Sequence, residues 1–236
     1  MRLDKLLANM GVGSRKEVKQ LLKAKRITVN EAIVKDNGMH VDPEHDQVCV
    51  DEELITYQKH IYLMMHKPPG VVSATSDKRD RTVIDLLSAD EKKFDPFPVG
   101  RLDKDTEGLL LITNDGELAH RLTSPKKHVE KVYIAYISGE FPEKIMEQFQ
   151  EGLTLDDGYQ TKPAKLEIVN KQSNKVKVTI TEGKYHQIKR MFITVGCKVT
   201  YLKRIQMGNL QLDESLPIGN FRPLTEDELQ YCKSLK

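Results

Sequence analysis

The sequence predicts an α+β protein with two domains: a small helix-helix-strand domain at the N-terminus, then a larger domain on a mixed, mostly antiparallel sheet. The chain has 236 residues, enough for a small module and a second domain with a substantial core. Hydrophobic residues make up 39% of the chain and charged residues 31%, as in globular proteins. Short strand-like segments interrupted by isolated helical ones favour a mixed sheet.

The N-terminal domain is predicted from local spacing. Four apolar residues at helical spacing predict a first helix: Leu3, Leu6, Leu7 and Met10. Ser14 and Glu17 form the capping-box pattern that begins a second helix. Alternating apolar residues then predict a hairpin over residues 27–34 and a strand over residues 48–50.

The larger domain is predicted to contain short strands and isolated helices. Strands are expected at residues 61–65, 109–113, 130–137, 165–170, 175–181 and 198–205. Helices are expected at residues 142–151, 185–195 and 225–234. The acidic stretch at residues 51–59 is the expected link, so the domains are placed at residues 1–58 and 59–236.

Charge is distributed unevenly, although the net charge of +2 says little about partners. Residues 1–35 carry nine basic and three acidic side chains, a net +6, whereas residues 36–58 carry seven acidic and no basic ones, a net −7. A concentrated positive field suggests an anionic partner that docks on one face. The alternative is a basic helix face that is simply solvated.

Three segments of the N-terminal domain, residues 1–7, 13–15 and 25–30, resemble the small RNA-binding domain named after the fourth small-subunit ribosomal protein. The resemblance covers about residues 1–50 and implies that the second helix and the following turn face RNA. It makes six basic residues candidate RNA contacts: Arg2, Lys5, Arg15, Lys19, Lys25 and Arg26. Such contacts would mostly hold phosphates, which gives affinity and orientation more than sequence choice.

Several protein classes are disfavoured by the sequence. The apolar runs are too short to span a bilayer, and the first residues lack the apolar core of a signal peptide, so we expect a cytoplasmic protein without a membrane partner. The three cysteines, Cys49, Cys197 and Cys232, lie far apart and have neither metal-ligand nor redox spacing. We therefore expect no metal site.

The segment at residues 100–116 carries the strongest indication of chemistry. It is a polar loop, bounded by glycine and bearing Asp103 and Asp105, that runs into an apolar strand. Loops held by a rigid sheet often carry catalytic groups. Aspartate is also common in helix caps and turns, so the pattern by itself leaves both interpretations open.

This segment resembles the signature of the RsuA-like family of pseudouridine synthases, the type that acts on small-subunit rRNA. The match continues in order through four further segments, at residues 66–73, 123–133, 182–192 and 219–225. The resemblance implies that Asp103 is the catalytic carboxylate, that Tyr133 is the active-site aromatic residue and that Lys189 is the basic partner of the aspartate. Without it, a core position for Tyr133 would be as good an interpretation as a functional one, and Lys189 would ordinarily lie on a solvated helix face.

Two other aspartates in this segment, Asp105 and Asp115, do not align with the catalytic role. They are predicted to be loop and turn residues.

The residue types suit the implied reaction. Pseudouridine formation breaks the bond from ribose to base nitrogen and rejoins the base through carbon 5, so no cofactor is expected. An ionised Asp103 can act as a nucleophile, and Lys189 would favour its ionised form. It could add to ribose carbon 1 or base carbon 6, or act first on the ribose carbon 2 proton. Tyr133 could stack on the detached base and help remove the carbon 5 proton.

The target base must leave its stack to reach Asp103, so base flipping is implied. Five residues are candidate contacts to the flipped nucleotide and its phosphates: Arg101, Lys131, His186, Gln187 and Arg190.

The resemblance implies an enzyme that acts on 16S rRNA, at the uridine conventionally numbered 516. Its partner would be 16S rRNA or a partly assembled small ribosomal subunit, and a monomer is expected because one chain carries all the parts. The segments at residues 123–125 and 189–192, with His128, resemble the small-subunit branch more than the large-subunit branch. The alternatives are a 23S rRNA pseudouridine synthase and a non-catalytic RNA-binding factor in ribosome assembly, against which the retained Asp103, Tyr133 and Lys189 argue.

Overall fold

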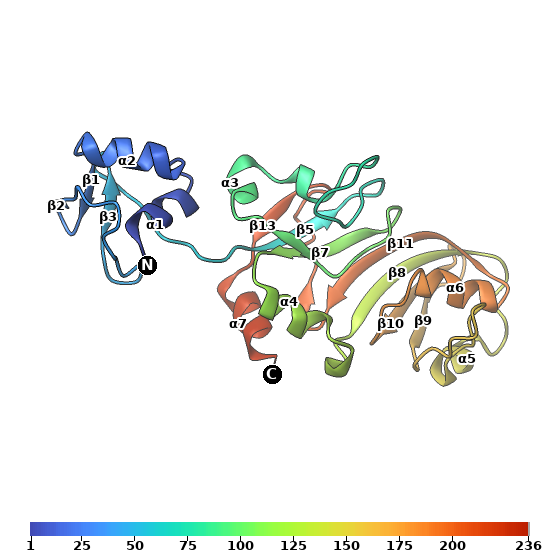
Figure 1. Cartoon of the computed structure of the whole chain (residues 1–236). Helices are drawn as coiled ribbons and strands as arrows, with labels where there is room; N and C mark the ends of the chain where they lie inside the picture. Colours follow the sequence, from blue (N-terminus) through green and yellow to red (C-terminus); the bar gives the residue numbers. More distant parts are fainter. Residues whose placement is uncertain (236) are drawn as a thin grey trace. The chain divides into compact units, whose positions relative to one another are not determined.

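Figure 1 shows a computed structural model, in which residues 1–235 are described. The chain forms two compact units. One comprises Met1–Ile61 with Ser88–Pro96, and the other comprises Tyr62–Leu87 with the chain from Phe97 onward. The two-part α+β organisation is therefore as predicted, while the boundary after residue 58 remains a proposal.

The first unit contains three described helices and a small antiparallel sheet. Its helices are α1 (Leu3–Asn9), α2 (Arg15–Lys23) and the short α3 (Ala89–Lys92). Its strands are β1 (Ile27–Val29), β2 (Ala32–Ile33), β3 (Val48–Val50) and β4 (Glu53–Leu54), in the order β2-β1-β3-β4. The capping box of Ser14 and Glu17 is present, and Leu3, Leu6 and Leu7 are buried, as their spacing predicts.

The stretch predicted as the link begins with a tight turn. Asp51 and Glu52 have positive φ values of 51° and 70°, and β4 follows them and pairs with β3. The usual hairpin signal for such a turn is Asn-Gly or Asp-Gly, and its absence here explains why this strand was not predicted.

The second unit is built on a nine-stranded sheet (Figure 1). Its strands are β5 (Tyr62–Lys67), β6 (Phe97–Val99), β7 (Glu107–Thr113), β8 (Lys131–Ser138), β9 (Lys165–Asn170), β10 (Lys175–Ile180), β11 (Lys198–Met207), β12 (Leu210–Gln211) and β13 (Phe221–Pro223). Seven follow the order β13-β5-β7-β11-β8-β10-β9, while β6 pairs with β7 and β12 with β11. All of these pairings are antiparallel except β7 with β11.

The second unit also contains helices. They are α4 (Gly116–Thr123), α5 (Ile145–Glu151), α6 (Gln187–Thr194) and α7 (Glu226–Ser234), with the short 3₁₀ turns η1 (Ile84–Leu86) and η2 (Pro125–Lys127). Helices α5 and α6 meet through Phe149 and Phe192, whose ring centroids lie 4.9 Å apart. No helix within residues 1–235 is long and apolar enough to cross a membrane.

Most predicted elements of this unit are found, with shifted ends. Helix α5 begins at Ile145, three residues later than predicted, and α6 begins at Gln187, because His186 before it is left-handed (φ 49°). The short strands β6, β12 and β13 were not predicted. Two of them contain proline, which a strand tolerates only at an edge, and β6 and β13 each pair with a single strand.

The parallel pairing of β7 with β11 depends on Gly108. Its φ is 111°, and a Cβ atom there would lie 2.2 Å from the backbone oxygen of Arg204. The buried Arg204 in turn donates from Nε to the carbonyl oxygen of Leu109, at 2.8 Å. Because the two strands run parallel, the loop that precedes β7 and the helix α6 that precedes β11 approach the sheet at the same end.

Candidate active site

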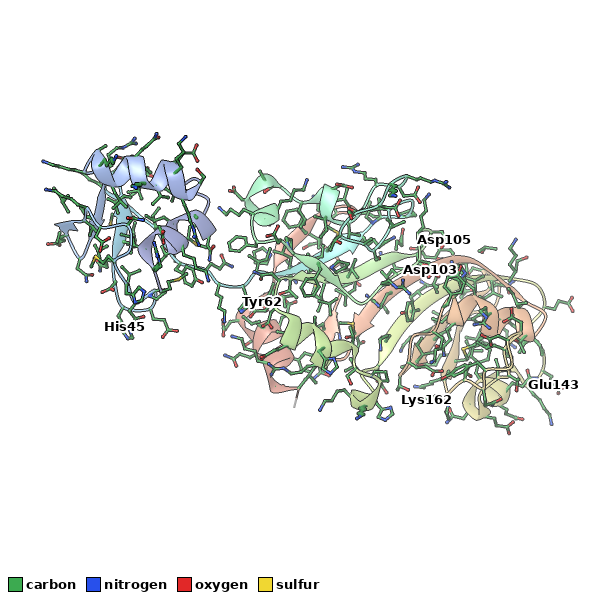
Figure 2. All side chains as sticks on the ribbon, in the orientation of Figure 1. His45, Tyr62, Asp103, Asp105, Glu143 and Lys162 are labelled. Atoms are coloured by element: carbon green, nitrogen blue, oxygen red, sulfur yellow. The ribbon has the colours of Figure 1, made fainter. Side chains whose placement is uncertain are left out.

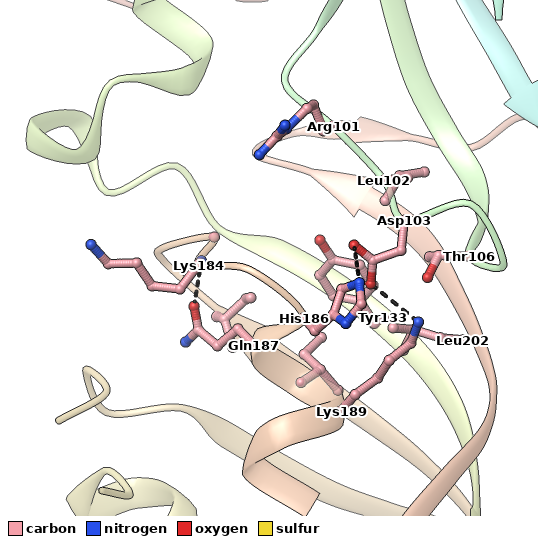
Figure 3. Close-up of a pocket in the computed structure, with 13 residues that line it drawn as sticks. Arg101, Leu102, Asp103, Thr106, Tyr133, Lys184, His186, Gln187, Lys189 and Leu202 are labelled. Carbon is pink, nitrogen blue, oxygen red and sulfur yellow. Dashed lines mark hydrogen bonds and ion pairs between the residues drawn. The ribbon is translucent and has the colours of Figure 1, made fainter. Parts of the chain in front are cut away.

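Asp103 lies in the loop between β6 and β7 and faces helix α6 (Figure 3). Nζ of Lys189 is 3.2 Å from one carboxylate oxygen of Asp103, and Nε2 of His186 is 3.7 Å from the other. Tyr133, on β8, is 7% exposed and lines the same pocket of about 70 Å³. Three sequence segments thus bring the predicted catalytic residues Asp103, Tyr133 and Lys189 together.

Lys189 is shared between two carboxylates. Its Nζ is also 2.5 Å from Oδ1 of Asp105, which lies near Asp103 in the same loop (Figure 2). Burial lowers the pKa of Lys189, but the two carboxylates outweigh it and hold that pKa above its usual value. Burial likewise raises the pKa of Asp105, and the bond from Lys189 outweighs it, so the net shift is downward. The site therefore keeps a cation beside Asp103 at neutral pH.

The loop that carries Asp103 is anchored by Lys67, a role that the sequence does not predict. This side chain, at the end of β5, is 0% exposed. Its Nζ donates to the carbonyl oxygens of Pro68 (3.0 Å), Asp103 (3.1 Å), Lys104 (3.4 Å) and Thr106 (2.8 Å). One buried ammonium therefore joins the end of β5 to the backbone that carries Asp103. The lysine belongs to the motif at residues 66–73, but nothing in that pattern indicates which backbone the lysine reaches.

The segment before α6 is held by a buried carboxylate, Glu182. It accepts hydrogen bonds from the hydroxyl of Tyr159 (2.6 Å), the backbone N–H of Lys162 (2.9 Å) and the side-chain amide of Gln187 (2.7 Å). The side-chain oxygen of Gln187 also accepts from the backbone N–H of Lys184, at 2.9 Å. Gln187, predicted to contact the nucleotide, does line the pocket, but these two bonds also make it a brace for the segment that presents His186.

A neighbouring hollow of about 350 Å³ shares Arg101 and Tyr133 with the Asp103 pocket. Lys131 and Arg204 line it as well. Nζ of Lys131 donates to the carbonyl oxygen of Val129 at 2.9 Å. Burial, aided by the positive charge of Arg204, lowers the pKa of Lys131 to about 8. Arg101 and Lys131 thus line the hollow in which an anionic group would bind beside Tyr133.

Arg190, the last predicted contact of this unit, points elsewhere. Its guanidinium pairs with Asp156 at 2.5 Å and Asp157 at 2.7 Å, and it is absent from the residues that line the Asp103 pocket. A sequence pattern could not show this, because both acidic partners lie more than thirty positions away along the chain.

The six basic candidates of the N-terminal unit divide into two groups. Arg2 pairs with the buried Asp4 at 2.8 Å, and Arg26 pairs with Asp51. The other four form no ion pair within 4.0 Å in the described part of the chain: Lys5, Arg15, Lys19 and Lys25. All four are exposed, so their charge is available to a ligand.

Within residues 1–235, no cluster of three or more His, Cys, Asp or Glu side chains has the arrangement of a metal site.

Comparison with known proteins identifies the family. The model for RNA pseudouridylate synthase matches residues 61–194, and that for the S4 domain matches residues 1–48. An uncharacterized RNA pseudouridine synthase of Bacillus subtilis (strain 168) is 53% identical over 231 residues, with 97% of each chain covered. Ribosomal small subunit pseudouridine synthase A of Escherichia coli (strain K12) is 39% identical over 230 residues, covering 97% of this chain and 98% of that one. A crystal structure of a pseudouridylate synthase, 36% identical, matches with a TM-score of 0.69 and covers 98% of this chain and 99% of that one. The chain therefore belongs to the RNA pseudouridylate synthase family and carries an S4 domain at its N-terminus.

Proposed function

We propose that the protein converts one uridine of 16S rRNA, at the position conventionally numbered 516, to pseudouridine, with Asp103 as the catalytic carboxylate. The observation that carries this proposal is the cluster of Asp103, Lys189 and Tyr133 in one pocket, with the ammonium 3.2 Å from the carboxylate. The relatives named as ribosomal small subunit pseudouridine synthase A, at 39–42% identity over 97% of the chain, support the small-subunit target.

The chemistry asks three things of the protein. Asp103 must be ionised to attack ribose carbon 1 or base carbon 6, or to remove the ribose carbon 2 proton, and the Lys189 ammonium lies 3.2 Å from it. The freed uracil must be held while it turns, and the ring of Tyr133 stands in the pocket wall. The carbon 5 proton must leave once the new bond to ribose has formed, and we propose the Tyr133 hydroxyl as its acceptor or relay.

The hollow beside Tyr133 predicts a pH dependence. Lys131 carries its charge below a pKa of about 8, so it attracts an RNA phosphate below that pH and loses this attraction above it. We expect kcat/KM to fall several-fold between about pH 7 and pH 9, with a midpoint near 8. Lys131→Arg, which stays charged, should keep kcat/KM level over this range, and Lys131→Met should be low throughout.

Two other causes of a decline with pH can be told apart from the titration of Lys131. Burial also lowers the pKa of Lys67 to about 8, so a decline that persists in Lys131→Arg would belong to Lys67 and contradict the assignment. Titration of either lysine does not lower kcat/KM by unfolding the protein. A depressed lysine pKa makes the folded state more stable as pH rises from about 8 towards the ordinary 10.5.

The N-terminal unit is proposed to hold phosphates through its unpaired cations. Lys19 is exposed on α2 and has no ion pair within 4.0 Å in the described residues, whereas Arg26 is paired with Asp51. We expect Lys19→Ala to weaken RNA binding equally for all sequences and to reduce the slope of log K against log salt by about one. Arg26→Ala serves as the matched comparison with a smaller slope change. An unchanged slope in Lys19→Ala would remove this helix from the RNA interface.

The proposed function is tested by mapping pseudouridine with carbodiimide labelling and primer extension. The substrates are modification-free 16S rRNA, early small-subunit particles and 23S rRNA, each treated with wild-type protein and with Asp103→Asn. The expected result is a single new stop in 16S rRNA or in the particle, at position 516, that the variant does not produce.

Other outcomes lead to the alternatives. A stop confined to 23S rRNA would assign the protein to the large subunit. Tight RNA binding without a stop on any substrate would make it a ribosome-assembly factor rather than an enzyme. Sedimentation of the RNA-bound protein tests the proposed monomer.

A further inference from the structure

An exposed aromatic ring stands at the rim of the active site. Tyr185 is 70% exposed, so burial of its ring does not account for its placement. The ring is stacked on His186, with centroids 3.8 Å apart and planes inclined by only 17°. Because Nε2 of His186 lies 3.7 Å from Asp103, the stack leads from the surface directly to the proposed catalytic carboxylate.

The stack forms one side of a separate hollow of about 380 Å³. Residues 72–74 and Lys104 also line it. Asp103 and His186 line both this hollow and the catalytic pocket. A group that occupies the hollow is therefore the immediate neighbour of a nucleotide whose reacting atoms are at Asp103.

The segment that carries the stack is held by hydrogen bonds on both sides. Glu182 and Gln187 brace the two ends of its segment through their 2.7 Å hydrogen bond. The carbonyl oxygen of Tyr185 accepts a bond of 3.4 Å from Arg190, itself tied to Asp156 and Asp157. An aromatic surface that is fixed before binding loses little conformational entropy when a ligand stacks on it.

We propose that this hollow is the subsite for the nucleotide next to the target uridine, whose base stacks on the exposed face of Tyr185. The inference rests on the proposed function and adds to it a second nucleotide position. Base–aromatic stacking accepts any base, because every base has a π-face. The subsite therefore holds the neighbour in place and contributes affinity with little sequence choice, while Asp103 acts on the flipped uridine.

The test uses a short RNA that contains the target uridine, with 2-aminopurine placed on its 5′ or its 3′ side. Binding of the full-length Asp103→Asn protein, which does not turn the RNA over, is expected to quench the fluorescence at one of the two sides. The quench should be lost with the further change Tyr185→Leu and kept with Tyr185→Phe, which retains the ring. Tyr136→Leu is the matched control, since Tyr136 is a tyrosine on β8 that is 36% exposed and lines neither hollow.

Kinetics supply the second readout. Tyr185→Leu in an otherwise wild-type protein should raise KM about 10-fold with kcat nearly unchanged, and Tyr185→Phe should restore KM. On an RNA with an abasic site in place of the stacked neighbour, wild type and Tyr185→Leu should have the same KM. Unchanged KM in Tyr185→Leu, or no quench on either side, would overturn the subsite. Absence of pseudouridine with the wild-type protein would instead overturn the proposed function, which the fluorescence readout does not depend on.

Discussion

Replacement of Asp103 by asparagine is expected to lower kcat by at least about 10⁴-fold. A loss of this size is typical when the reacting side chain of an enzyme is removed. The amide has nearly the shape of the carboxylate but neither its charge nor its nucleophilicity. The side chain is partly exposed in a loop held by Lys67, so the fold and RNA affinity should stay close to wild type. Single-turnover release of tritium from RNA labelled at uracil carbon 5 measures the step directly.

The matched control for this experiment is Asp105→Asn. Asp105 belongs to the same loop and contacts the same Lys189 ammonium at 2.5 Å, but its side chain is 72% exposed. We expect a loss of less than about 10-fold, because Asp103 itself is unchanged and remains beside Lys189. Equal losses in the two variants would show that the site needs the summed charge of both carboxylates, and would contradict the assignment of Asp103 as the reacting group.

Lys67→Met is expected to lower the free energy of unfolding of the second unit by about 3 kcal/mol, because it leaves buried carbonyl oxygens without their donor. Four carbonyl oxygens lie within 3.4 Å of Nζ, among them those of Asp103 and Thr106. The loop should loosen, so kcat should also fall by about 10²-fold, as when a reacting group is displaced. Urea unfolding followed by near-UV circular dichroism measures the stability, and single-turnover kinetics measure the rate.

Lys104→Met is the control for the stability change. Lys104 lies in the same loop, but its ammonium is at the surface and pairs with Asp80 at 2.7 Å. Its replacement should change stability by no more than about 0.5 kcal/mol. If Lys67→Met does not accumulate as folded protein, Lys67→Arg, which keeps the charge and the donors, should recover most of the stability. A wild-type urea midpoint in Lys67→Met would mean that the four bonds do not hold the loop.

The elements that periodicity predicts best are longer strands of the sheet. Strands β8, β9, β10 and β11 lie within two residues of their predicted ends, because each is six or more residues long. In β10 buried and half-buried side chains alternate along the whole strand, as its apolar pattern predicts. Strands β4, β12 and β13 have two or three residues each, too few for a pattern. They exist because a neighbouring strand supplies their hydrogen bonds.

The predicted site residues divide in a similar way. The motifs around Asp103, Tyr133 and Lys189 were recognisable along the chain, and the structure brings these three residues into one pocket. Arg190 follows Lys189 directly, yet its guanidinium leaves the site for Asp156 and Asp157. Adjacent positions on a helix point in different directions, and which side chain finds a partner depends on what the fold places opposite it.

The sequence by itself determined the class of fold, the two-part organisation and the segments that carry chemistry, because helix caps, apolar periods and motifs are local properties of the chain. Only the tertiary structure decided which of those side chains meet. The sharing of Lys189 between Asp103 and Asp105, the anchoring of their loop by Lys67, and the stack of Tyr185 at the rim each depend on the fold. The parallel pairing of β7 with β11 at Gly108 brings the loop before β7 and helix α6 to the same end of the sheet. No pattern within either strand specifies this pairing.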